Sequence, residues 1–191
     1  SYNGAEIVSP ILTAADIPKL QEVVRAVRQA GGRVNESCGI HIHIDGAALA
    51  GKSMRNLIKT CKAKEDLFDF ALGIEDRTQR ADGWCRRVGD ETVAAISAQR
   101  NPTHSSILRE WPGTRYMGLN LRALERHGTV EFRWFAATLH AGRVKAYIQF
   151  ILALAAKAIV SRSASANKPN IDTDNMADEG YAMRVVLLRL G

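Results

Sequence analysis

The sequence predicts an α+β fold, in which short strands, two of them joined as an antiparallel hairpin, pack with longer helices. Segments in which polar and apolar residues alternate indicate strands, and longer segments with apolar residues at helical spacing indicate helices. The chain has 191 residues, of which 46% are hydrophobic and 24% charged. This composition is typical of a soluble globular protein, and the length suits one domain with a substantial core.

The first half of the chain alternates between strands and helices. Ala5–Pro10 is expected to be a strand that ends at its proline. Asp16–Gln29 is expected to be a helix that Asp16 caps, Cys38–Asp45 a strand, and Lys52–Leu72 a second helix. Because the opening strand has no preceding neighbour to pair with, we expect residues 1–191 to be a single domain cut or processed from a longer chain.

The second half is expected to continue through an irregular region, a hairpin and two helices. Glu75–Gly113 shows little periodicity apart from a short helix within Glu91–Ala98. The later elements are two strands, Tyr116–Arg122 and Thr129–Phe135, joined by a turn at Leu124–Gly128, then a helix over Gly142–Ser161, a loop over Ser163–Asp174 and a last helix over Met176–Leu190.

Two histidines share one face of the strand in Gly39–Asp45. Ile40, Ile42 and Ile44 alternate with His41, His43 and Asp45, so the polar side chains project together and can meet one ion or one phosphate. The plain alternative is a solvated polar face. A second alternative is zinc bound by Cys38 with the histidines, although this spacing matches no common structural zinc module.

The strand Thr129–Phe135 places a carboxylate and a guanidinium on one face. Glu131 can hold a divalent cation and Arg133 can grip a phosphate, or the two can simply pair with each other. Other polar candidates are less distinctive by themselves: Asn120 and Arg122 on the preceding strand, Arg77 in an arginine-rich segment, and Glu6 in the opening strand. For each of these the alternative is an ordinary solvated side chain.

The charge and cysteine content narrow the class of protein. A net charge of +6 suits an anionic substrate such as a nucleotide, and without a long basic run we expect no specific nucleic-acid partner. Three cysteines with no paired spacing and no visible secretory signal predict a reducing compartment, the cytoplasm. The most apolar stretch, Ala146–Val160, is too short and too polar to span a membrane.

The order of these motifs resembles the amidoligase family, which is similar to glutamine synthetase and glutamate–cysteine ligase. The resemblance covers roughly Asn3–Val160 and rests on the Glu6 strand, the His-x-His strand and the Thr-x-Glu-x-Arg strand. It implies a glutamine synthetase-like catalytic fold, whose antiparallel sheet has a concave polar face flanked by helices. It implies Mg²⁺ ligands at Glu6, His41, His43 and Glu131, catalytic roles for Glu131 and Arg133, and ATP contacts from Arg77, Asn120, Arg122 and Arg133.

The function implied by the resemblance is an ATP- and Mg²⁺-dependent carboxylate–amine ligase. Such an enzyme joins a small-molecule or peptide carboxylate to an amine as an amide or isopeptide, through an acyl phosphate. The family usually begins with an upstream Glu-x-Glu strand, which this sequence does not contain. An inactive interaction domain therefore stays open, as does a zinc module or metal-dependent hydrolase built on Cys38, His41, His43 and Asp45. The sequence leaves the oligomeric state open.

Overall fold

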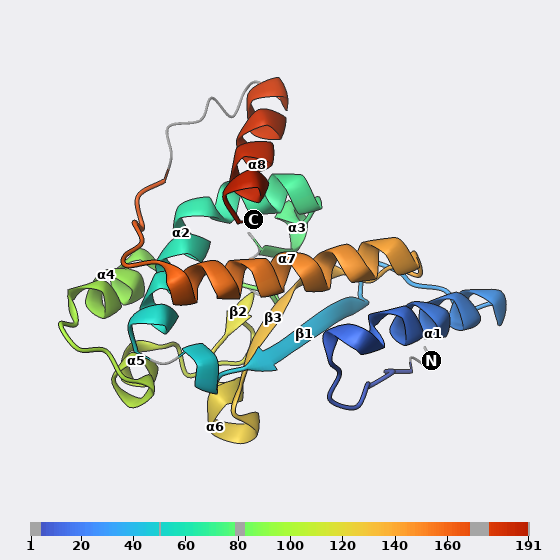
Figure 1. Ribbon diagram of the computed structural model, residues 1–191, viewed down its shortest axis with the longest axis horizontal. Coiled ribbons are helices and arrows are strands. Elements are labelled where there is room, and N and C mark those ends of the chain that lie inside the picture. The colour runs from blue at the N-terminus through green and yellow to red at the C-terminus, as the bar shows by residue number, and fades with distance from the viewer. Residues whose placement is uncertain (1–4, 50, 79–82, 169–175, 191) are drawn as a thin grey trace.

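Three antiparallel strands and the helices around them make an α+β fold in the computed structural model, which describes residues 5–49, 51–78, 83–168 and 176–190 (Figure 1). The strands are β1 (Gly39–Asp45), β2 (Leu119–Asn120) and β3 (Thr129–Ala136), and their order in the sheet is β1-β3-β2. Strand β3 is therefore the central strand, with a neighbour on each side.

The register of the sheet brings the polar motifs side by side. Glu131 of β3 lies opposite His43 of β1 and opposite Asn120 of β2. Between the pairs Ile40–Phe135 and Ile42–Phe132 the register shifts, because β3 has one more residue there than β1. This β-bulge changes which way successive side chains of β3 point, so both Trp134 and Phe135 are buried although they are neighbours.

The described helices surround the sheet and contain most of the core. Their bounds are η1 Ala14–Asp16, α1 Ile17–Gln29, η2 Ala47–Leu49, α2 Lys52–Leu72, α3 Glu75–Thr78, α4 Asp90–Ala98, α5 His104–Glu110, α6 Ala123–His127, α7 Ala141–Val160 and α8 Met176–Leu190. Helix α2 ends at Gly73, whose positive φ of 61° gives the left-handed C-cap that glycine adopts without strain.

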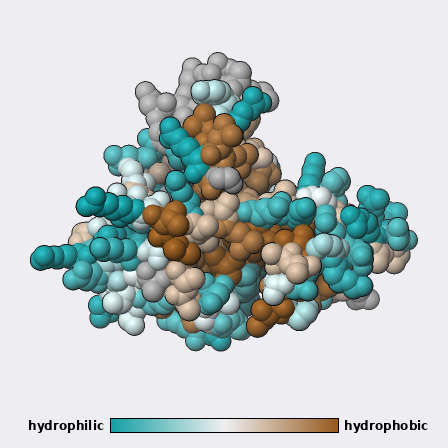
Figure 2. All heavy atoms as spheres, in the orientation of Figure 1, coloured by the Kyte–Doolittle hydropathy of each residue, from teal (hydrophilic) through white to brown (hydrophobic). Residues whose placement is uncertain are grey.

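Helices α2 and α7 cover the apolar face of the sheet. Phe68 of α2 contacts Phe150 of α7 and Trp134 of β3, with ring centroids 5.1 and 5.9 Å apart. Fully buried Phe132 and Phe135 complete this aromatic core. Figure 2 shows further apolar side chains at the surface over α7 and α8. With one face packed on helices, the polar side chains of β1 and β3 are left on the other face.

Most predicted elements are confirmed, but two strands and the predicted hairpin turn are not. Ala5–Pro10 is exposed and has no regular secondary structure, because it pairs with no strand among the described residues. The strand predicted for Tyr116–Arg122 is reduced to Leu119–Asn120, and helix α6 rather than a turn links it to β3. Helix α5 was not expected. Part of the loop predicted for Ser163–Asp174, residues 169–174, lies outside the described residues.

None of the described helices combines the length and the apolar character that crossing a membrane requires.

Candidate active site

The Glu131 carboxylate is the centre of the polar face of the sheet. It is 5% exposed, and its two oxygens have separate partners. Asn120 Nδ2 donates to Oε2 at 2.6 Å, and Arg133 Nη1 donates to Oε1 at 2.7 Å. The pairing of Glu131 with Arg133, one of the two alternatives drawn from the sequence, is thus present. Charge-assisted bonds of this kind are roughly twice as strong as neutral ones.

Both histidines of β1 converge on the same carboxylate oxygen. His41 Nδ1 lies 3.2 Å and His43 Nε2 lies 3.6 Å from Glu131 Oε1. The other ring nitrogen of His43 lies 2.9 Å from the hydroxyl of Thr129, which fixes the orientation of that ring. His41 is also 3.4 Å from Arg133 Nη1. The bulge places Arg133 opposite His41, so a single oxygen is surrounded by two imidazoles and a guanidinium.

The pKa shifts follow from this arrangement. Burial by itself raises the pKa of Glu131, but the Asn120 hydrogen bond and the Arg133 charge outweigh it and hold that pKa below its ordinary value. Burial, reinforced by the Arg133 charge, lowers the pKa of His41, although Glu131 and Glu6 oppose the shift. At neutral pH the site therefore contains an ionised carboxylate, a charged guanidinium and a neutral His41.

Arg77 lies beside the beginning of β1. Its Nη1 donates to the carbonyls of Glu36 and Cys38 at 3.3 and 3.1 Å. A β-carbon on Gly39 would come within 2.8 Å of Arg77 Nη2 and 3.6 Å of His41 Nε2. A side chain at position 39 would push this guanidinium aside, and the same contacts place Arg77 near His41, at the edge of the site.

Glu6 is exposed, outside any strand, yet it is close enough to His41 for its charge to raise the pKa of that imidazole. The structure thus gathers Glu6, His41, His43, Asn120, Glu131 and Arg133, with Arg77 at the edge. The segment that carries Glu6 is not the strand that was predicted, but the charge of Glu6 still acts on His41.

Arg122 lies elsewhere. Its guanidinium donates to the carbonyls of Leu108, Trp111 and Pro112 at 2.5–3.0 Å and pairs with Glu125 at 2.9 Å. These contacts satisfy carbonyl oxygens at the C-terminal end of α5, where a helix leaves its last carbonyls without partners. The alternation of Asn120 and Arg122 placed them on one face, but the strand ends at Asn120 and the chain turns into α6.

Trp84 borders the site and was not selected as a site residue from the sequence. Its carbonyl accepts a hydrogen bond of 3.4 Å from Arg133 Nε. Periodicity gives no signal in this irregular segment. The sequence did contain one indication that Trp84 could be a site residue. It is a large aromatic residue near a glycine and several arginines, in a segment where no strand or helix pattern predicts that it is buried.

A preformed metal centre is not found: within the described ranges, no group of three or more His, Cys, Asp and Glu residues is arranged to hold a metal ion. The zinc alternative also needs Cys38 and Asp45, and both of these side chains have other partners. Cys38 Sγ donates to Asn35 Oδ1 at 3.3 Å, and Asp45 Oδ1 accepts from the Ala47 amide at 2.9 Å. A buried glutamate and a nearby exposed one do match Mg²⁺, which binds one or two carboxylates together with phosphates and water.

Comparison with known proteins agrees with the motif order. A sequence model of the family described as "Putative amidoligase enzyme" matches residues 2–155, which contain every residue of the site. No curated protein and no solved structure matches the chain. Since the match covers well over half of the 191 residues and contains the three strands described above, the chain belongs to the amidoligase family.

Proposed function

We propose that this protein is an ATP- and Mg²⁺-dependent carboxylate–amine ligase with a glutamine synthetase-like catalytic fold, acting in the cytoplasm. The observation that carries the proposal is the Glu131 carboxylate, buried and ionised between β1 and β2, with Arg133 and two histidines around one oxygen. Membership of the amidoligase family supports the same reaction class. The three free cysteines suit a reducing compartment.

The proposed reaction has two steps. A carboxylate resists attack by an amine because its oxygen is a poor leaving group. Transfer of the γ-phosphoryl group of ATP to a carboxylate oxygen gives an acyl phosphate and ADP. The amine then attacks the acyl carbon, the carbon–oxygen bond to phosphate breaks, and the amide, inorganic phosphate and a proton are released. Catalysis of this kind depends chiefly on positioning and on neutralising charge.

Arg133 is proposed to contact the phosphoryl group during transfer. Its side chain is 12% exposed, and Glu131, His41 and the Trp84 carbonyl hold it from three sides. A guanidinium held in this way loses little freedom when it binds phosphate oxygens, and its planar fork matches them. Arg77 and Asn120 are proposed as further contacts of the nucleotide or of its ligands.

Neutral His41 is proposed to accept the proton that the attacking amine loses. Its lowered pKa keeps the imidazole unprotonated at neutral pH, as a general base must be. Glu131, His43 and Glu6 are the residues that would hold Mg²⁺, and His41 is proposed as the base in place of the ligand role that the resemblance implied. The ion, when bound, would neutralise the charge of the ATP phosphates.

The test is amine-dependent release of ADP from ATP by the purified protein, with mixtures of amino acids and short peptides offered as carboxylate and amine. We expect Arg133→Ala to lower the rate by about 10³-fold, as loss of a phosphoryl-stabilising arginine does, and Glu131→Ala to lower it at least as much. The matched controls are Glu125→Ala and Arg126→Ala, which change the same residue types on the exposed surface of α6.

Unchanged ADP release in the Glu131 and Arg133 variants would show that the site assignment is wrong. A folded protein that binds no nucleotide would support the alternative of an interaction domain that has kept the fold without the activity. Zinc retained stoichiometrically through purification would favour the hydrolase or zinc-module alternative.

A further inference from the structure

We propose that Trp84, supported by Tyr116, is the stacking platform for the adenine base of the nucleotide. This inference rests on the proposed function, because it assigns a part of the same ATP site. It extends that site away from the sheet, to the segment that precedes β2.

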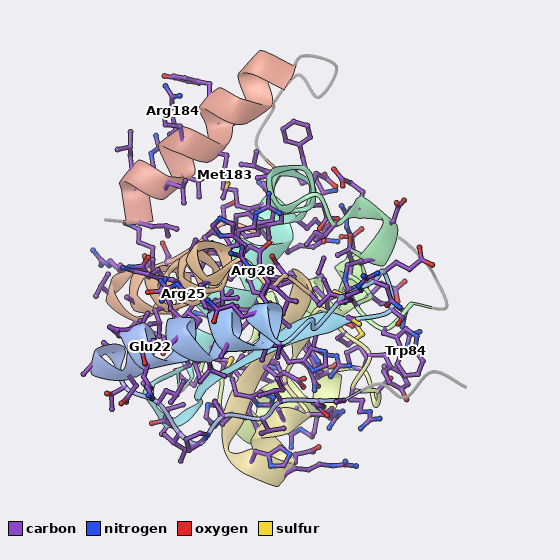
Figure 3. All side chains as sticks on the ribbon, turned by 90° about the vertical axis from the view of Figure 1, so that its right-hand side faces the viewer. Glu22, Arg25, Arg28, Trp84, Met183 and Arg184 are labelled. Carbon is purple, nitrogen blue, oxygen red and sulfur yellow. The ribbon has the colours of Figure 1, made fainter. Side chains whose placement is uncertain are left out.

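Trp84 is the unusual tryptophan of this chain. It is 65% exposed, whereas Trp111 and Trp134 are 2% and 9% exposed and belong to the core. Among the described aromatic side chains, Tyr181 on α8 is comparably exposed, at 68%. Figure 3 shows Trp84 at the outer edge of the molecule, on the side away from Met183 and Arg184 of α8. A large indole left in water at the rim of a polar site suits a ligand with a planar face.

The platform is held in place by its neighbours. The ring of Tyr116 meets that of Trp84 edge-on, with centroids 4.6 Å apart and planes 78° apart. The following residue, Cys85, is buried, and the backbone of Arg86 bonds to Tyr116 and Gly118 at 2.9 and 2.8 Å. The backbone next to Trp84 is therefore bonded to the residues that precede β2, and the Tyr116 ring holds the indole in one orientation.

The position and the charge around Trp84 favour a nucleotide. Its backbone carbonyl accepts from Arg133 Nε at 3.4 Å, so the residue that carries the indole contacts the proposed phosphoryl-binding arginine through its main chain. Arg115 lies over the Tyr116 ring, 5.3 Å from its centroid, and adds a second positive charge beside the platform. A ligand with a planar ring at one end and several negative charges at the other matches this arrangement, and ATP has that form.

The experiment uses Trp84 as its own reporter. Titration with ATP and with ADP is expected to quench tryptophan fluorescence, since the one strongly exposed indole would stack on the base, while inorganic tripolyphosphate leaves it unchanged. Calorimetry then gives the affinities of the variants. Trp84→Ala is expected to weaken ATP binding about tenfold, within the range for a lost base–aromatic stack, and Trp84→Phe to retain most of it.

In turnover, Trp84→Ala should raise the KM for ATP about tenfold and leave kcat within about twofold, because the base is remote from the reacting phosphoryl group. The matched control is Tyr181→Ala, which removes another strongly exposed aromatic side chain, on α8, and is expected to change neither constant.

Three outcomes separate this inference from the proposed function. ATP binding with unchanged fluorescence and an unchanged affinity in Trp84→Ala would overturn the stacking platform alone. Binding that depends on Trp84, without amine-dependent ADP release, would uphold the platform and overturn the ligase. No binding of ATP at all would overturn both.

Discussion

Replacing Glu131 by glutamine should destabilise the fold strongly, because it removes one charge from a nearly buried pair and leaves the other. Glu131 is 5% exposed and the Arg133 side chain 12% exposed. After the change Arg133 loses its charged partner and keeps a neutral hydrogen bond to the amide oxygen of the new side chain, with two longer contacts to His41 and the Trp84 carbonyl at 3.4 Å each. Breaking a buried pair costs about 3–5 kcal/mol, and the partial exposure of Arg133 places this one near about 3 kcal/mol.

The assay is urea-induced unfolding followed by circular dichroism, with thermal unfolding beside it. A loss of about 3 kcal/mol in the free energy of unfolding corresponds to a fall in Tm of about 6–12 °C for a domain of this size. Adding Arg133→Gln to Glu131→Gln should restore part of the loss, because the unpaired charge is then gone. The two substitutions should therefore show a coupling of about 1–3 kcal/mol.

Glu125→Gln is the matched control, since it makes the same substitution in an ion pair whose carboxylate is 49% exposed. We expect this control to cost less than about 0.5 kcal/mol. The reasoning would be refuted if Glu131→Gln were no more damaging than the control. It would also be refuted if the effects of Glu131→Gln and Arg133→Gln simply added within about 0.5 kcal/mol.

Three further predictions concern the surroundings of the site. Gly118→Ala should cost about 2 kcal/mol, because its β-carbon would lie 2.3 Å from Trp134 Nε1, whereas Gly113→Ala meets nothing within 4 Å; equal melting temperatures for the two variants would contradict this. Arg122→Ala should lower the free energy of unfolding by about 2 kcal/mol, since three carbonyls lose their donor; unchanged urea unfolding would contradict it. The third concerns pH: with its pKa below the ordinary 6.5, folded His41 binds protons less readily than the unfolded chain, so its contribution to stability is lost as pH falls below 6.5. The stability difference between wild type and His41→Gln should therefore decrease from pH 7.5 to pH 5.5 in urea unfolding, and a constant difference would show that the shift is absent.

The periodic elements of this protein could be predicted from sequence because each carries its own pattern. His41 and His43 lie on the polar face of β1, as the alternation with isoleucine indicates, and α1, α2 and α7 follow their apolar spacing. The same local rule fails at Arg122. Strand parity predicts a side chain's direction only while the strand lasts, and here the strand ends two residues earlier.

The sequence by itself determined the α+β class, the strand that carries both histidines, the strand that carries Glu131, and the family. These depend on local alternation and on motif order, which a chain displays before it folds. Only the tertiary structure decided that Glu131 pairs with Arg133 and Asn120. The same holds for the hydrogen bond from Arg122 to a carbonyl of helix α5 and for the position of Trp84 beside the site. Those contacts join residues on separate elements, and register, a bulge and packing set them; no periodic pattern along the chain encodes these distances.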